Sequence, residues 1–248
     1  MNLLILDSGH AEKVAGKRNE KENFYEWKFN DSMQYKIKKR AEDHGITVYL
    51  TNPSPKGVDE MGLSKRCTLA NNYWRSKSKP KSLFISLHAN AFSDPSARGT
   101  ETYVHNTNAS QNSKNVARYV QDELMKCMKS LDSSAKDRGV KSDNYAVLRG
   151  TSMPSILIEY AFYSNLADLK ILKNNQDDLT EATVKAICKY FNVEYKTVQK
   201  NSEPSTKPST GTQLYAVCVG AWKDKDVANS KVNELKQKGY TSAYLIPR

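Results

Sequence analysis

The sequence opens on the stretch Leu3-Leu4-Ile5-Leu6-Asp7-Ser8-Gly9-His10, in which four aliphatic residues precede polar ones and a histidine. Two later segments have the same form, one apolar run leading to His88 and another ending directly before Glu159. Short apolar runs of this kind predict buried strands. Because parallel strands of an α/β sheet direct their carboxyl ends to one edge, where ligands bind, we expect these three polar side chains to converge there.

Helical and strand patterns alternate between and around these segments. Phe29, Met33, Ile37 and Ala41 recur every four residues, which predicts an amphipathic helix from Glu26. Further patterns predict helices capped by Ser64 and over residues 110–131, 166–172 and 179–191, and strands over 46–50, 83–87, 100–104, 146–148 and 155–158. The predicted fold class is therefore α/β, a mostly parallel twisted sheet flanked by helices.

The 248 residues are enough for one sizeable core and an appendage. We predict a catalytic domain over 1–195 and a flexible linker over 196–212, where the sequence is polar, contains two prolines and lacks apolar periodicity. The pattern over residues 213–248 predicts a small β-α-β module, with its helix over 224–238.

The composition limits the partners and the compartment. A net charge of +11 and a pI near 9.3 indicate an anionic partner, for which nucleic acid, phospholipid and an anionic cell wall all qualify. Nucleic acid ranks last because no recognition motif accompanies the charge. No apolar stretch approaches a membrane span, so no membrane insertion is expected.

A cleavable leader would remove the candidate His10, so we expect synthesis in the cytoplasm without a signal peptide. The four cysteines are scattered with no C-x-x-C spacing, and we expect reduced, half-buried thiols.

The polar residues at the strand ends suit a hydrolytic zinc site. Such a site uses three protein ligands, an open position, a water whose pKa falls to about 7, and a nearby base. His10 and His88 supply two ligands, and Glu159 is the candidate base. The third ligand is open at this point: Glu26 is well placed at its helix start, with Glu20, Glu22 and Glu12 as alternatives.

Each of these residues also has a structural explanation. A histidine after a strand is commonly a hydrogen-bonded loop residue, as we expect of His44 and His105, and Glu26 could simply favour the positive end of its helix. Glu159 is harder to explain in this way, because an acid directly after an apolar strand is costly unless it is paired or linked to a metal.

Six motifs in the right order combine these residues. They are the segment Leu6–His10, which is similar to D-P-G-H with Ser8 at the proline; Glu26–Asn30, E-x-x-x-N; Leu63–Asn71, L-x-x-R…A-N; Ser86–Ala91, S-x-H-A-N-A; Gly99–Tyr103; and Val147–Asn165. Together they resemble the zinc-dependent N-acetylmuramoyl-L-alanine amidases of the amidase type 3 family. The resemblance runs from the first strand to about Phe191.

The resemblance implies a role for each candidate. His10, Glu26 and His88 would bind one Zn²⁺ ion, Glu159 would be the catalytic acid and base, and Asn90, Glu101 and Arg149 would shape or contact the substrate cleft. The implied activity is that of a peptidoglycan hydrolase, in which zinc-activated water cleaves the amide between N-acetylmuramic acid and L-alanine of the stem peptide. The rival functions are a zinc peptidase cutting within the stem peptide and a non-catalytic cell-wall-binding protein.

The tail has a resemblance of its own. Tyr215–Trp222 and Leu235–Tyr240 are similar to half of a sporulation-related repeat (SPOR domain), a peptidoglycan-binding module. The full module has two such halves, which suggests a homodimer paired through two tails. With peptidoglycan and anionic wall polymers as partners, the chain resembles a phage or prophage endolysin that acts at the wall after release; an autolysin that lyses the mother cell at sporulation is the other route.

Overall fold

The computed structural model describes residues 1–197 and 225–237. The chain divides into two compact units, Met1–Val198 and Gln199–Arg248. In the second unit the described element is helix α7, Lys225–Gln237, which agrees with the helix predicted over 224–238. The predicted linker from residue 198 on and both strands of the predicted C-terminal module lie outside the described residues.

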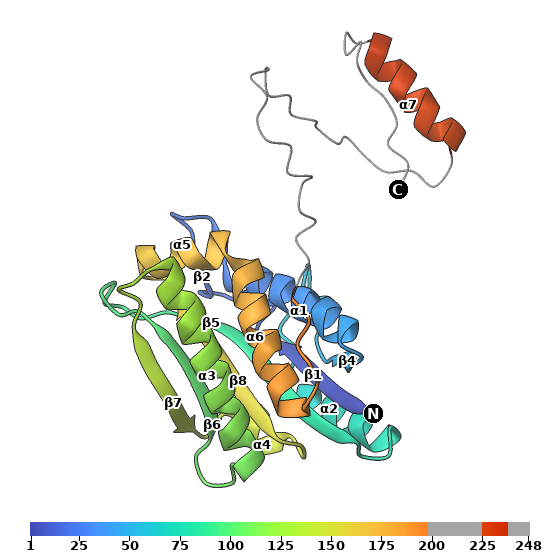
Figure 1. Cartoon of the computed structure of the whole chain (residues 1–248). Helices are drawn as coiled ribbons and strands as arrows, with labels where there is room; N and C mark the ends of the chain where they lie inside the picture. The colour runs from blue at the N-terminus through green and yellow to red at the C-terminus, as the bar shows by residue number, and fades with distance from the viewer. Residues whose placement is uncertain (198–224, 238–248) are drawn as a thin grey trace. The chain divides into compact units, whose positions relative to one another are not determined.

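A six-stranded sheet forms the centre of the first unit, in the order β4-β1-β5-β8-β6-β7 (Figure 1). Its strands are β1, Asn2–Ser8; β4, Thr47–Leu50; β5, Lys81–Asn90; β6, Thr100–His105; β7, Asp137–Asp143; and β8, Ser155–Phe162. Strands β4, β1, β5 and β8 are parallel, whereas β6 is antiparallel to β8 and β7 is parallel to β6. Two short strands, β2 (Arg18–Asn19) and β3 (Phe24–Tyr25), form a separate antiparallel pair. The predicted mostly parallel sheet is confirmed.

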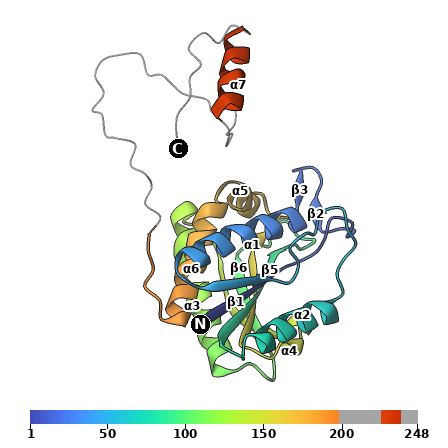
Figure 2. The same cartoon turned by 90° about the vertical axis from the view of Figure 1, so that its right-hand side faces the viewer.

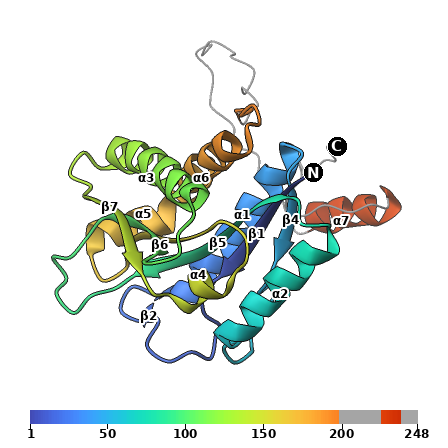
Figure 3. The ribbon, with the colours of Figure 1, turned by 90° about the horizontal axis from the view of Figure 1, so that it is seen from below.

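Helices cover both faces of this sheet. They are α1, Glu26–Asp43; α2, Leu63–Ser76; α3, Gln111–Leu131; α4, Ala146–Gly150; α5, Leu166–Asn174; and α6, Gln176–Phe191. Helices α1, α3, α5 and α6 lie on one face, and α2 and α4 lie on the other (Figures 2 and 3). Within residues 1–197 and 225–237, no helix combines the length and the apolar character that crossing a membrane requires.

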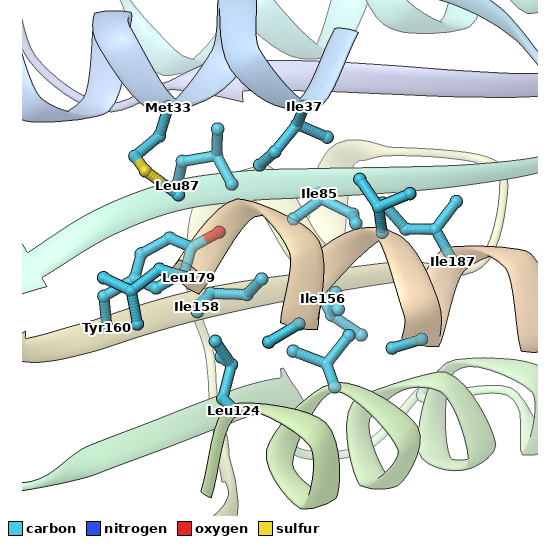
Figure 4. Packing of buried hydrophobic residues seen from close by; sticks show 14 of the residues in the cluster. Met33, Ile37, Ile85, Leu87, Leu124, Ile156, Ile158, Tyr160, Leu179 and Ile187 are labelled. Atoms are coloured by element: carbon cyan, nitrogen blue, oxygen red, sulfur yellow. The ribbon is translucent and has the colours of Figure 1, made fainter. Parts of the chain in front are cut away.

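Two hydrophobic cores result from this layering, because successive side chains of a strand point to opposite faces. In β1, Leu4 and Leu6 belong to the larger core, and Leu3 and Ile5 to the smaller one. Figure 4 shows the larger core, in which helices α1, α3 and α6 pack against β5 and β8 through Met33, Ile37, Leu124, Leu179, Ile187, Ile85, Leu87, Ile156, Ile158 and Tyr160. Burial on both faces explains why the central strands read as continuous apolar runs.

Two secondary-structure predictions are wrong. Residues 146–148, expected as a strand, form the short helix α4, with Val147 and Leu148 buried in the smaller core. A three-residue apolar run satisfies either a buried strand or one buried helical turn, so periodicity alone could not decide. The edge strand β7 was not predicted, because its mostly exposed sequence, Asp-Arg-Gly-Val-Lys-Ser-Asp, contains no apolar alternation.

One predicted helix start differs from the structure and one agrees with it. Ser64 was expected to cap its helix, but α2 begins at Leu63, and its N-cap residue is Gly62 with no side-chain cap. Ser110, at the start of the segment predicted over 110–131, is the N-cap of α3, and its hydroxyl accepts a hydrogen bond from the Ser113 amide at 3.1 Å. The three described cysteines are free thiols: Cys67 and Cys188 are buried, and Cys127 is partly buried.

The fully buried carboxylate of Asp168 in α5 holds together the chain segments that flank β6 and β8. It accepts hydrogen bonds from Arg98 Nε at 2.9 Å, the Gly99 amide at 2.7 Å and the Phe162 amide at 3.1 Å. Arg98 in turn donates to Asp132 at 2.7 Å. A buried carboxylate with these partners is a costly group to alter, because its loss takes the acceptor from the Gly99 and Phe162 amides and one of two carboxylates from Arg98.

We predict that Asp168→Asn lowers the free energy of unfolding by about 3 kcal/mol, since an amide nitrogen would face backbone or guanidinium donors. Asp177→Asn is the matched control, because Asp177 is exposed and pairs with Lys36 at 2.5 Å across the surface; its cost should stay below about 1 kcal/mol. Urea denaturation of both variants measures the difference. Equal losses would contradict the structural role of Asp168.

Candidate active site

The carboxyl ends of β1, β5 and β8 open into one cavity of about 370 Å³. Its lining includes His10 after β1, His88 in β5, Glu159 in β8 and Glu26 at the start of α1. Residues separated by up to 149 positions in sequence therefore share one site at the sheet edge, as parallel strands predict.

Three side chains form a compact cluster in this cavity. One ligand-type atom from each of His10, Glu26 and His88 lies within 4.8 Å of the others. The Glu26 Oε1 atom is 3.1 Å from His88 Nδ1 and 3.5 Å from His10 Nε2. The two imidazole rings meet edge to face, with centroids 5.0 Å apart. Two nitrogens and one carboxylate oxygen are a donor set that could hold a transition metal ion.

The backbone around His10 is shaped for this close approach. A Cβ atom on Gly9 would lie 2.1 Å from His88 Cε1, so no side chain fits at that position. His10 itself has a φ of 64°, in the left-handed region that non-glycine residues seldom occupy. Asn30 Nδ2 donates to the Gly9 carbonyl at 3.0 Å, and Asn52 Nδ2 donates to the His10 carbonyl at 3.2 Å. These bonds hold the turn that presents His10.

Burial and charge act against each other in the cluster. Burial alone would raise the pKa of Glu26, but the hydrogen bond and charge of His88, the charge of His10 and the Ala89 amide together lower it. Burial alone would lower the pKa of His88, yet the contact with Glu26 raises it. For His10, burial dominates and lowers the pKa. Glu26 is thus held as an anion between two imidazoles.

Glu159 lies beside this cluster in a different environment. It is the partner of His88 in the register of β5 and β8. Its Oε2 atom is buried, and the described residues supply no hydrogen-bond partner for it. Burial raises the pKa of Glu159 to about 8, with the charges of Glu26 and Glu101 adding to the effect and His88 opposing it. A carboxyl group of this kind can both hold and release a proton near neutral pH.

The other three predicted site residues occupy three different positions. Asn90 lines the cavity, and its amide donates to Glu101 Oε1 at 2.7 Å. Glu101 is buried behind Asn90 and is not among the lining residues. Arg149 is exposed outside the lining, and its guanidinium donates to the Asn144 side chain at 2.5 Å.

The alternative ligands considered from sequence have other partners. Glu12 accepts from the Gly57 amide at 2.6 Å, Glu20 pairs with Arg18 at 2.8 Å, and Glu22 lies 3.8 Å from Lys173. His44 and His105 also lie outside the cluster, hydrogen-bonded to Arg40 and Asn144, respectively. Of the four glutamates considered, the structure brings Glu26 to the two histidines.

Sequence reasoning assigned no role to several residues that lie at the site. Lys17 and Glu60 line the cavity, and Glu60 Oε2 is 3.3 Å from His10 Nδ1. The fully buried Arg66 bonds to both Glu60 and Asp7. Arg66 belongs to a motif that could have directed attention to it, whereas Glu60 lies in a polar loop without periodicity.

Comparisons with known proteins identify relatives of this chain. Residues 4–189 match the model of the N-acetylmuramoyl-L-alanine amidase family amidase 3. An endolysin of Bacillus phage SPP1 is 28% identical over 214 residues, which cover 84% of this chain and 73% of that protein.

Two solved structures share the fold over more than three quarters of this chain. An N-acetylmuramoyl-L-alanine amidase from Clostridium difficile 630 superposes with a TM-score of 0.66 at 29% identity, covering 77% of this chain and 96% of that one. The catalytic domain of the amidase CwlV from Bacillus (Paenibacillus) polymyxa also gives 0.66, at 26% identity over 78% of this chain and 100% of that one. With three quarters of its length matched by the family model, the chain belongs to the amidase 3 family of N-acetylmuramoyl-L-alanine amidases.

Proposed function

We propose that this amidase is zinc-dependent, with His10, Glu26 and His88 binding one ion and Glu159 acting as general base and acid. The observation that carries the proposal is the cluster of these three side chains next to Glu159 Oε2, a buried atom for which the described part of the chain offers no hydrogen-bond partner. The substrate bond is the amide between N-acetylmuramic acid and L-alanine of peptidoglycan, as in the family to which the chain belongs.

The residues present fit zinc. Imidazole nitrogens and a carboxylate oxygen are common zinc ligands, and catalytic zinc sites typically use three protein ligands and leave one position for water or substrate. The cluster provides three ligand-type atoms within 4.8 Å of one another, and it lies in an open cavity of about 370 Å³. The buried anion Glu26 gains a positive partner when a cation binds.

A bound zinc ion supplies Lewis acidity, which polarises the substrate carbonyl and lowers the pKa of water. In the mechanism that we propose, Glu159 takes a proton from the attacking water. As the amide carbon–nitrogen bond breaks, the same carboxyl group delivers that proton to the alanine nitrogen, which leaves as an amine. In the metal-free chain, burial raises the pKa of Glu159. A cation at the neighbouring cluster would favour its ionised form, which is the form that takes the proton from water.

For substrate contact, we propose Asn90 at the cavity wall, held in place by Glu101. Arg149 is exposed outside the lining, so its proposed contact with the substrate rests on the motif resemblance alone. On sequence grounds alone we also propose an endolysin-like role at the wall, contact with anionic wall polymers, and peptidoglycan binding by the 213–248 module through paired tails.

We predict that the purified wild-type chain binds one zinc ion, that a chelator removes both metal and activity, and that added zinc restores them. His88→Ala should lose the ion, because two ligands cannot hold it as tightly as three. His44→Ala is the matched control, since His44 is bonded at the end of α1 and lies outside the cluster. Elemental analysis of each variant measures the stoichiometry. Equal zinc content in the two variants would contradict the ligand assignment.

Digestion of purified peptidoglycan followed by labelling of new amino termini tests the reaction. Wild type should expose N-terminal alanine, and Glu159→Gln should lower the rate by about 10²- to 10⁴-fold while retaining zinc, because the proton carrier is lost. A new terminus within the stem peptide would instead indicate a peptidase. Wall binding with no new terminus from the zinc-loaded wild type would indicate a non-catalytic binding protein.

The raised pKa of Glu159 also predicts a pH dependence of stability in the metal-free chain. Between the ordinary value of 4.5 and the raised value of about 8, the unfolded chain is ionised at this position while the folded chain holds a proton. Folding therefore becomes less favourable as the pH rises across this window. Glu159→Gln removes the effect, so the variant should gain stability relative to wild type from about pH 5 to 8. Urea denaturation in the presence of chelator measures this, and a constant difference would refute the raised pKa.

A further inference from the structure

We propose that Glu60 is a positioning residue for the metal centre: it orients His10 and fixes the ring tautomer that leaves Nε2 free for the ion. This inference rests on the proposed zinc site. Glu60 lies in the loop between β4 and α2, 50 residues away from His10 in sequence, and its side chain lines the same cavity.

The two nitrogens of the His10 ring have different carboxylate neighbours. Nε2 lies 3.5 Å from Glu26 Oε1, within the cluster of ligand-type atoms, and Nδ1 lies 3.3 Å from Glu60 Oε2. A neutral imidazole carries one proton, so the nitrogen that binds a metal must be the one without it. A proton on Nδ1, donated to Glu60, leaves the Nε2 lone pair directed at the cluster.

Glu60 is itself held by a buried guanidinium. Arg66 Nη2 donates to Glu60 Oε1 at 3.3 Å, and Arg66 Nε donates to the Met61 carbonyl at 3.0 Å. The two oxygens of Glu60 are thereby divided between two donors, one on His10 and one on Arg66. This arrangement makes the carboxylate a bridge between a buried anchor and a candidate ligand.

The anchor is tied to the strand that leads to His10. Arg66 Nη1 donates to Asp7 Oδ1 at 3.1 Å and to the Ser8 carbonyl at 2.6 Å. Asp7 also accepts from Thr51 at 2.6 Å and from Ser86 at 2.9 Å, so its carboxylate joins three parts of the chain. The loop that carries Glu60 is thus fixed to the end of β1, directly before the turn at Gly9 that presents His10.

Glu60 is more exposed than Arg66 and Asp7, the two residues that hold it in place. The side chain of Glu60 is 32% exposed, whereas those of Arg66 and Asp7 are 1% and 2% exposed. Ion pairs with an exposed partner contribute little to folding, while breaking a buried pair is strongly destabilising. Replacing Glu60 should therefore affect the metal centre and leave the fold intact, which makes it the residue to test.

The chemistry of a carboxylate is specific here. Both oxygens of Glu60 accept a hydrogen bond, one from Nδ1–H of His10 and one from Arg66. A carboxamide has one acceptor oxygen and an NH₂ group, so Glu60→Gln would set a donor against either His10 or Arg66. Glu60→Gln should therefore behave like Glu60→Ala, and Glu60→Asp, which keeps both acceptors, should recover part of the function.

The experiment measures zinc affinity directly by competition with a chromophoric chelator, using the full chain. We expect Glu60→Ala and Glu60→Gln to weaken zinc binding by about 10- to 100-fold, as for other groups that orient metal-ligating histidines. Glu60→Asp should fall between these variants and wild type. Asp59→Asn is the matched control, because Asp59 is the adjacent exposed acid and is not among the residues that line the cavity; its affinity should equal that of wild type.

Thermal unfolding of the metal-free variants separates positioning from folding. Unchanged midpoints with weakened zinc binding support the inference. Wild-type zinc affinity in both Glu60→Ala and Glu60→Gln would overturn the inference. An equal loss of zinc affinity in Asp59→Asn would also overturn it, because removing any nearby negative charge would then have the same effect. If wild type itself binds no zinc, the proposed zinc site is refuted. That result differs from one in which wild type binds zinc and the Glu60 variants bind it equally well, which refutes the role of Glu60 alone.

Discussion

The buried carboxylate of Glu26 is the constraint on which the site depends. An ionised carboxylate in the interior is stable only with several donors or positive partners. The Glu26 Oε1 atom lies 3.1 Å from His88 Nδ1. It also accepts hydrogen bonds from the Ala89 amide at 3.2 Å and from Asn30 Nδ2 at 3.5 Å. Each partner comes from β5 or from α1 itself, so the carboxylate fixes the start of the helix against the end of the strand. The tight turn at Gly9 then allows His10 to approach the same group.

The sheet supplies the rest of the geometry. β1, β5 and β8 are adjacent and parallel, and they are buried on both faces, so their carboxyl ends are held rigidly. The register pairs His88 with Glu159 across β5 and β8, which sets the candidate ligand and the candidate proton carrier side by side. Sites built on rigid strands keep such spacings more precisely than sites built on loops. His10, which does lie in a turn, is held by backbone bonds from Asn30 and Asn52.

These contrasts explain how far the sequence could predict the molecule. The central strands and long helices were predictable because their apolar periodicity reports burial, and the strand-end residues were predictable because parallel topology gathers them. The exposed edge strand β7 and the short helix α4 carry no such periodicity. Glu60 was not predictable for a different reason: its role depends on contacts with His10 and Arg66 that no local pattern encodes. Charge and spacing likewise left the third ligand open among four glutamates until the motif resemblance indicated Glu26.

Two carboxyl groups that lie opposite each other on β6 and β8 have pKa values shifted in opposite directions by their surroundings. Glu101 and Glu159 are register partners, yet Glu101 accepts hydrogen bonds from Asn90, Tyr103, Arg138 and Lys141. Burial would raise the pKa of Glu101, but Lys141 and Arg138 lower it, so Glu101 stays an anion. Its charge in turn helps raise the pKa of Glu159, whose Oε2 has no such partner among the described residues. Pairs of acids whose pKa values are pushed apart in this way divide their roles: Glu101 can serve as a fixed anion that holds Asn90, and Glu159 is left as the group that can exchange a proton.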